Sequence, residues 1–162
     1  MLEETEQDKI DELLELFSKD NPTESIQQIS YLIFLKQLEK SDQVNSRNAK
    51  IKGESYNSMF DNQESCKWSS WNNMQGTEMI KHVRDEVFPF LRKLDENQTS
   101  YAKYLNNANF AIADGKKLTR AVKIINSELF GDKDKIGEIY YYLLSNLDIE
   151  KEKKQYRTPD HI

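Results

Sequence analysis

Few side chains in this sequence have the type and spacing that catalysis requires. The two histidines, His82 and His161, and the single cysteine, Cys66, form no metal-ligand spacing. A lysine follows the cysteine and is able to lower a thiol pKa, but the sequence supplies no partner base. The five glycines are scattered, so no phosphate-binding loop is present. We therefore expect no catalytic and no metal-binding residue in this chain, and we interpret His82 as a helix-surface or interface residue.

Basic side chains suggest binding instead. They form two groups, which are Lys116, Arg120 and Lys123 at helical spacing, and Lys151, Lys153, Lys154 and Arg157 further on. Stripes of this kind contact nucleic-acid phosphates, although most lysine stripes are simply solvated surfaces. The net charge of −5 argues against a dedicated nucleic-acid binder. Residues 1–114 carry 13 basic and 20 acidic side chains, whereas residues 115–162 carry 10 and 8.

Aromatic residues are the other candidates for binding. Trp68, Trp71, Tyr101 and Tyr140–Tyr142 are either interface anchors or parts of the core. With an apolar fraction of only 37%, most of them are needed for the core.

Length and composition indicate one helical domain. A chain of 162 residues is long enough to bury a core without disulfides, and the charged fraction of 31% suits well-solvated helices. The lone cysteine permits no intrachain disulfide, which favours a reducing compartment. No apolar run approaches a membrane span, and the acidic first residues do not resemble a signal peptide. We expect a cytoplasmic protein without membrane contact.

Hydrophobic periodicity predicts the elements that position these residues. The first helix covers residues 10–17, and the second starts at Asn21-Pro22 and continues to residue 40. Apolar residues surround the middle of this second helix, so we place it at the centre of the bundle. Residues 41–76 are polar with scattered aromatics, and we expect a long loop-like excursion pinned by Phe60 and the two tryptophans.

The second half of the chain continues the helical pattern. A third helix starts at Thr77, and Pro89 should kink or end it near Val87. A short helix follows around residues 101–108, and a longer one covers residues 116–130. The longer helix has an apolar stripe on one face, formed by Leu118, Ala121, Val122, Ile125 and Leu129. The last helix is capped by Asp132 and presents a stripe of Ile136, Ile139, Tyr140, Leu143, Leu144 and Leu147. The sequence predicts an all-α fold, an irregular bundle of about five or six helices.

Four segments together resemble one protein family. SIQQISYLIFLKQLEK resembles the ISYLLFLKxLE helix near the start of type I restriction–modification DNA methyltransferase (modification, M) subunits, and IKHVRDEVFPFLRKL resembles their VRDEVFPFLR helix. LTRAVKIINSELFGDKDKIGEIYYYLLSNL is similar to a helix pair that ends in GDIYEYLLSKL. QYRTPDHI is similar to GQFRTPRHI, the junction into the methyltransferase domain. The resemblance runs from about residue 6 to residue 162, in family order.

The resemblance implies a domain division and a cofactor. Residues 1–150 would be the N-terminal helical domain, and residues 151–162 a linker and the start of an otherwise absent methyltransferase domain. Tyr156, Arg157, Thr158 and Pro159 match the segment that lines part of the S-adenosylmethionine pocket in the full-length parent. Lys154 replaces the usual glycine and Asp160 replaces a common basic residue. No cofactor is expected for this chain alone, because the cofactor-binding fold of the family, its cofactor loop and its catalytic motif are absent from the sequence.

The implied function is that of an accessory domain. The full-length parent would be a site-specific adenine-N6 DNA methyltransferase, whereas this piece would be non-catalytic and help to assemble or clamp the complex on double-stranded DNA. Its partners would be the specificity (S) subunit, a second M subunit and possibly the restriction (R) subunit. The two basic groups then become candidate phosphate contacts. The alternative is a free-standing helical protein-interaction module, or a truncated gene product, without catalysis.

Overall fold

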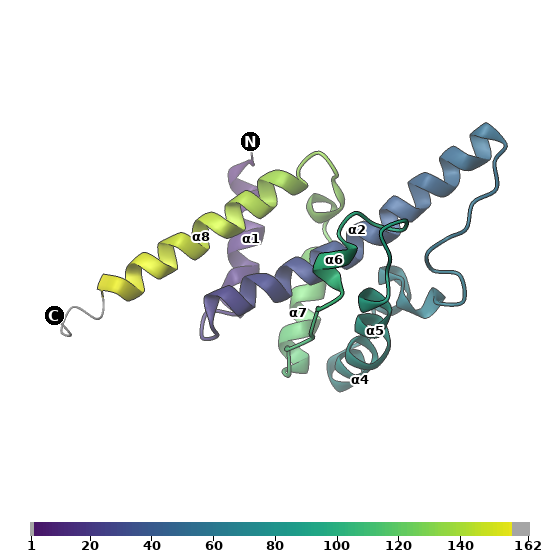
Figure 1. Cartoon of the computed structure of the whole chain (residues 1–162). Helices are drawn as coiled ribbons and strands as arrows, with labels where there is room; N and C mark the ends of the chain where they lie inside the picture. The colour runs from purple at the N-terminus through teal and green to yellow at the C-terminus, as the bar shows by residue number, and fades with distance from the viewer. Residues whose placement is uncertain (1, 157–162) are drawn as a thin grey trace.

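The computed structural model describes residues 2–156, with side chains up to residue 146, and this part of the chain is all-α without a strand (Figure 1). The prediction of an all-α bundle is confirmed. Five longer helical runs are joined by short helices and turns. The longer runs are α1 (Glu4–Leu16), α2 (Pro22–Lys52), α4 (Gly76–His82) with its continuation to Arg92, α7 (Gly115–Ile125) and α8 (Ile136–Tyr156).

Helix α2 is longer than the sequence suggested. The Asn21 side chain accepts the amide of Glu24 at 3.1 Å, and Pro22 takes the first helical position, as predicted. The helix then continues through residues 41–52 and ends only at Gly53, which adopts a left-handed φ of 71°. The prediction that residue 41 begins a loop was therefore wrong. The polar residues of segment 41–52 form the solvated surface of a projecting helix, and no glycine or proline interrupts this segment.

Residues 54–75, which we call the strap, return along α2 and contain η1 (Glu64–Cys66) and α3 (Trp68–Trp71). The predicted anchors are confirmed, because Phe60, Trp68 and Trp71 are all buried. Two buried acids of α2 add polar anchors. Glu39 accepts the Ser69 amide at 3.1 Å and the Ser69 hydroxyl at 2.6 Å.

The second acid holds the beginning of the strap. Asp42 accepts the Tyr56 hydroxyl at 2.6 Å and the Ser58 hydroxyl at 2.7 Å. Burial and the neighbouring carboxylate raise the pKa of Tyr56 to about 12. The strap is consequently a fixed part of the fold rather than a free loop.

Pro89 changes the third helical run without ending it. Helix α4 passes into a π-helical turn, η2 (Val83–Val87), where the Phe88 amide donates to the Val83 carbonyl, and then into α5 (Phe88–Arg92). Proline is tolerated near the start of a helix because its missing N–H is not needed there. Of the two predicted outcomes, the end near Val87 does not occur, because the helical run continues through the π turn to Arg92, and the kink stays a prediction.

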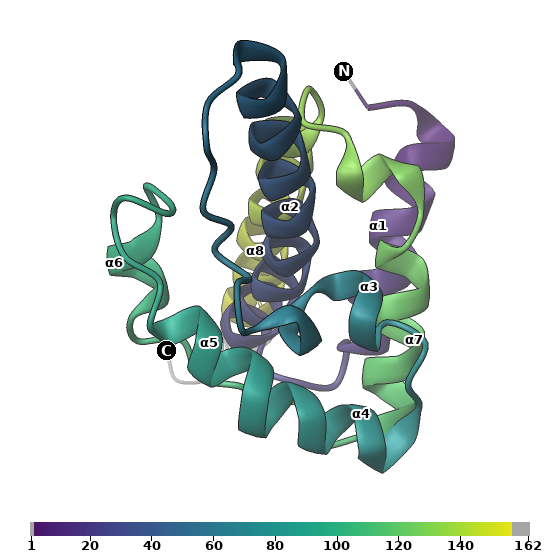
Figure 2. The same cartoon turned by 90° about the vertical axis from the view of Figure 1, so that its right-hand side faces the viewer.

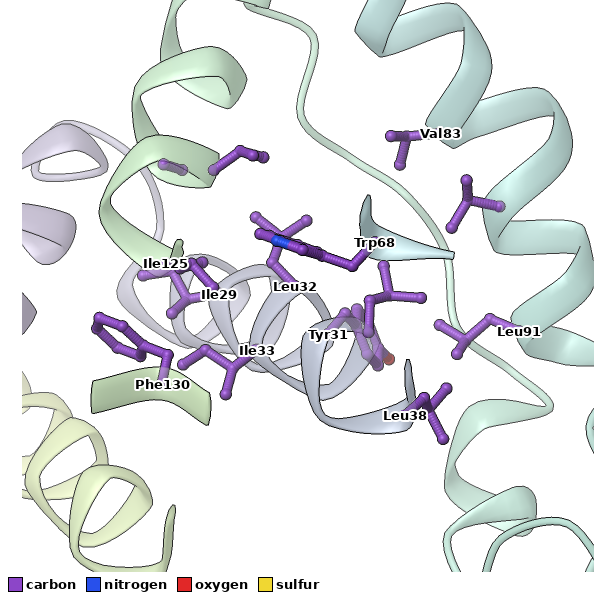
Figure 3. Close-up of a cluster of buried hydrophobic side chains, with 14 of the residues drawn as sticks. Ile29, Tyr31, Leu32, Ile33, Leu38, Trp68, Val83, Leu91, Ile125 and Phe130 are labelled. Atoms are coloured by element: carbon purple, nitrogen blue, oxygen red, sulfur yellow. The ribbon is translucent and has the colours of Figure 1, made fainter. Parts of the chain in front are cut away.

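Helix α2 occupies the centre of the molecule, as predicted. It packs against α1, α3, α7, α8 and η3 (Glu128–Gly131), and Figure 2 shows it between α1 and α7 on one side and α5 and α6 (Ala102–Leu105) on the other. Figure 3 shows Ile29 and Leu32 of α2 next to Ile125 and Trp68 in the buried cluster. In Figure 1, α8 runs beside α2 in the opposite direction.

Helix α8 departs from its prediction in two respects. Asp132 caps the preceding turn, where its side chain accepts the Asp134 amide at 2.9 Å, and the helix starts later at Ile136. The predicted stripe is also only partly covered. Ile139 and Leu143 are fully buried, whereas 54% of Leu144 is exposed. Periodicity alone does not show how wide a strip of the helix surface its neighbours cover.

Candidate nucleic-acid interface

Helix α7 presents the first predicted basic group. Its start is fixed by Asp114, whose carboxylate accepts the backbone amides of Lys116 at 2.9 Å and Lys117 at 3.3 Å. Its inner face is the predicted apolar stripe, and all members up to the helix end are buried: Leu118, Ala121, Val122 and Ile125. One face is therefore anchored in the core, which directs the opposite face outward.

Lys116, Arg120 and Lys123, which we call the basic stripe, lie on this outward face and are all exposed. Within the part of the chain that the structure describes, no carboxylate side chain forms an ion pair with them. Lys117 differs, because it pairs with Asp20 at 2.6 Å and lies over the ring of Phe17. Three cations spaced along one helix face are consequently available for a ligand.

The C-terminal end of α7 and the following turn η3 are held by lysine and glutamine side chains from α2. Lys36 Nζ donates to the carbonyls of Ile125 and Ser127, both at 2.7 Å. Gln37 donates to the Phe130 carbonyl, and Lys40 donates to that of Gly131 at 2.6 Å. A cation at this position stabilises the helix dipole.

The partly buried position of Lys36 disfavours the charged form of its side chain. Burial, together with the nearby charge of Lys40, lowers the pKa of Lys36 to about 8. Its ammonium group is thus committed to the fold and is not part of the exposed basic surface.

The N-terminal end of α7 meets the start of α4 at a close backbone crossing. A Cβ atom placed on Gly115 would lie 2.7 Å from the carbonyl carbon of Gly76. The Gly76 amide donates to the Thr119 hydroxyl at 3.0 Å. With both ends fixed, α7 forms a rigid platform for the basic stripe, which reduces the backbone ordering needed when a ligand binds.

The second basic group lies in the C-terminal part of the chain, where the structure describes the backbone up to Tyr156 but no side chains. Lys151, Lys153 and Lys154 belong to the last turns of α8, whose side chains lie outside the described residues. Helix α8 continues through Tyr156, so its backbone includes residues 151–156, which the family resemblance assigned to a linker. The other candidate cofactor residues, Arg157, Thr158 and Pro159, lie outside the described residues.

The remaining candidates for chemistry have structural partners. His82 Nδ1 lies 2.7 Å from a carboxylate oxygen of Glu86, and its Nε2 lies 2.8 Å from the Ser65 carbonyl, so the ring links η2 to η1. Cys66 is buried, and burial raises the pKa of its thiol, which disfavours the reactive thiolate. Among the described residues no group of three or more His, Cys, Asp or Glu is arranged to hold a metal ion.

Sequence reasoning missed a groove with a volume of about 840 Å³ between α2, α8 and residues 98–104. Tyr101 and Tyr104 line the groove, and 59% of Tyr101 and 50% of Tyr104 are exposed to solvent. Tyr101 had been considered as an interface anchor, and its exposure fits that interpretation, whereas Trp68 and Trp71 belong to the core. The signal in the sequence was the pair of tyrosines three residues apart on a short predicted helix. No helix among the described residues is long and apolar enough to cross a membrane.

Comparison with known proteins identifies one family. Residues 7–125, which is more than half of the chain, match the family described as the HsdM N-terminal domain. The match includes α2, the strap, the α4–α5 run and α7. No curated protein and no solved structure matches the chain.

Proposed function

Since this chain belongs to the HsdM N-terminal domain family, the N-terminal domains of type I restriction–modification M subunits, we propose that it is an accessory domain that contacts the phosphates of double-stranded DNA and docks onto other subunits. It takes no part in the chemistry of methyl transfer. That step belongs to a methyltransferase domain that binds S-adenosylmethionine and extracts the target adenine from the duplex.

The observation that supports DNA contact is the basic stripe on α7. Its three cations are exposed and lack carboxylate partners among the described residues, on a helix that is fixed at both ends. Phosphate contacts position a protein on the duplex and carry no base information. The domain would therefore hold DNA at any sequence, while another subunit reads the bases.

The proposed partners follow from the family. They are the specificity subunit, a second M subunit and, in a restriction-competent complex, the restriction subunit. S-adenosylmethionine would be bound by the full-length parent, with Tyr156, Arg157, Thr158 and Pro159 contributing to its pocket. The setting of such a complex is the cytoplasm, where its DNA lies.

The test is the salt dependence of DNA binding by the assembled M and S subunits. Replacing Lys116, Arg120 and Lys123 by glutamine should weaken binding and reduce the slope of log K against log salt by about 0.9 for each lost phosphate contact. Affinity should fall by a similar factor on cognate and non-cognate duplexes, because the contacts are to phosphates.

A matched control removes the same charge elsewhere. Arg47, Lys50 and Lys52 are exposed near the end of α2, and their replacement by glutamine should leave the slope unchanged. An unchanged slope in the α7 variant would remove the basic stripe from the DNA interface. An equal decrease in both variants would mean that only the overall charge of the domain matters.

A further inference from the structure

The groove between α2 and α8 brings together four of the six large hydrophobic residues that are exposed among the described side chains. These four residues are Val44, Tyr101, Tyr104 and Leu144. Its deeper lining includes the buried side chains Ile26, Leu38 and Leu143. A contiguous apolar hollow of this kind on a strongly charged protein marks a binding surface.

The aromatic wall of the groove is ordered before any ligand binds. Phe34 of α2 meets the ring of Tyr101 edge to face, with ring centroids 5.1 Å apart, and Tyr104 lies against Tyr31 at 5.6 Å. Tyr140 of α8 is half-buried beside them, and burial raises the pKa of its hydroxyl. Aromatic side chains that are already positioned cost little entropy when a partner binds.

The charge of the groove is opposite to that of the chain. Acidic residues outnumber basic ones by 28 to 23, yet none of the residues that line the groove carries a carboxylate. Two lysines, Lys40 and Lys133, lie among the lining residues, and the ammonium group of Lys40 keeps two N–H donors besides the one bonded to the Gly131 carbonyl. A ligand with negative charge beside an apolar face would complement this surface.

The shape selects an elongated ligand. The lining residues of α2 extend from Ile26 to Asn45, a distance of about 28 Å at the helical rise of 1.5 Å per residue. The long walls are helices, whose backbone groups are already hydrogen-bonded internally. An extended peptide would find few backbone partners there, whereas a helix satisfies its own backbone and offers side chains at positions i, i+4 and i+7.

We propose that this groove is the docking site for an amphipathic helix with an apolar face and acidic flanks, contributed by another subunit. The choice of a subunit as the source rests on the proposed function, whereas the chemistry of the helix rests on the groove itself. The apolar face would pack on Val44, Tyr104 and Leu144. Its acidic flanks would lie beside Lys40 and Lys133.

A direct test uses the 162-residue chain and synthetic helical peptides of ~18 residues, the length that spans the groove. One peptide carries leucines on one face with glutamates on both flanks. The second replaces the glutamates by lysines, and the third has the acidic composition in scrambled order. Binding of fluorescein-labelled peptides is followed by anisotropy. The acidic amphipathic peptide should bind most tightly, with a Kd roughly tenfold below that of the other two.

Two variants locate the binding. Leu144→Glu places a carboxylate on the groove wall and should raise the Kd of the acidic peptide roughly tenfold, because it adds like charge and removes an apolar contact. Ile51→Glu is the matched control, since Ile51 is 78% exposed on α2 outside the groove, and it should leave the Kd unchanged. Far-ultraviolet circular dichroism checks that both variants remain folded.

Three results would overturn the proposal. The first is an absence of binding by the acidic peptide at concentrations up to about 1 mM, the weak end of specific association. The second is equal binding of all three peptides. The third is tight binding of an oligothymidylate that Leu144→Glu abolishes, which would assign the groove to single-stranded DNA. None of these results affects the salt slope of the basic stripe, so the two proposals can fail separately.

Discussion

The polar side chains on one face of α2 are hydrogen-bonded to the segments packed against that face. The opposite face of α2 lies beside tyrosines and a leucine of neighbouring segments that remain exposed. On the first, the closed face, Gln28 bonds to the Asn109 carbonyl and the Ala111 amide, Lys36 to the end of α7, and Glu39 to the strap. On the second, the open face, Ser30, Phe34 and Val44 line the groove.

The difference separates stability from recognition within one helix. Every polar group named on the closed face has a partner, so that face requires nothing from outside. The open face keeps apolar surface in water, which costs free energy until a partner covers it. The comparison predicts that substitutions on the closed face lower the free energy of unfolding, whereas substitutions at the groove change binding without lowering the free energy of unfolding by more than about 0.5 kcal/mol.

The largest effect is expected for Trp71→Ala. Trp71 belongs to α3, which is bonded to the closed face through Ser69 and Glu39. It is fully buried, its ring centroid lies 4.8 Å from that of Trp68, and its indole N–H donates to the Cys66 carbonyl. Truncation should lower the free energy of unfolding by about 3–5 kcal/mol, measured by urea denaturation. Leu144→Ala on the open side should change it by less than about 0.5 kcal/mol. Equal losses in the two variants would refute the distinction between the faces.

A pair of glycines gives a sharper comparison with the same chemical change. Gly115→Ala should cost about 1–3 kcal/mol, because the new Cβ would lie 2.7 Å from the Gly76 backbone, which yields less readily than the end of a flexible side chain. Gly137→Ala, beside the groove, meets nothing within 4 Å and should stabilise α8 by up to about 1 kcal/mol. Thermal unfolding of the two variants should therefore shift in opposite directions. A stabilised Gly115→Ala protein would show that the crossing is looser than the structure indicates.

The sequence allowed the closed face to be predicted in outline. The central position of α2 followed from apolar residues on most of its surface, and the buried stripe of α7 followed from helical spacing. Capping by Asn21 followed from local chemistry. The hydrogen-bond partner of Glu39 could not be predicted in this way, because Ser69 lies 30 residues away and only the packed fold brings the two residues together.

The open face was less accessible to prediction for a related reason. Leu143 and Leu144 are neighbours on the same predicted stripe, yet only the first is covered. Which of them is buried depends on where α2 and residues 98–104 end up, and periodicity does not carry that information. The extension of α2 beyond residue 40 was missed because polar residues without glycine or proline are compatible with either a loop or a solvated helix.

The last prediction concerns a partly buried charge on the closed face, the ammonium group of Lys36. The pKa of Lys36 falls to about 8 in the folded protein, whereas an unfolded lysine has a pKa near 10.4. Between these two values the unfolded chain binds more protons than the folded one, so the contribution of Lys36 to stability rises with pH. This contribution is fully present above the unfolded pKa and is lost as the pH falls through about 8.

The variant Lys36→Met isolates this contribution, because it removes the titrating group and leaves the carbonyls of Ile125 and Ser127 without their donor. It should be less stable than the parent at every pH. The difference in the free energy of unfolding between the two proteins should widen as the pH rises from about 8 to about 10.4, because only the parent releases the cost of a buried ammonium group. Urea denaturation at several pH values in this range measures it. A difference that stays constant across the range would mean that solvent reaches Lys36 in the folded state, and the closed face would then be open at the end of α7.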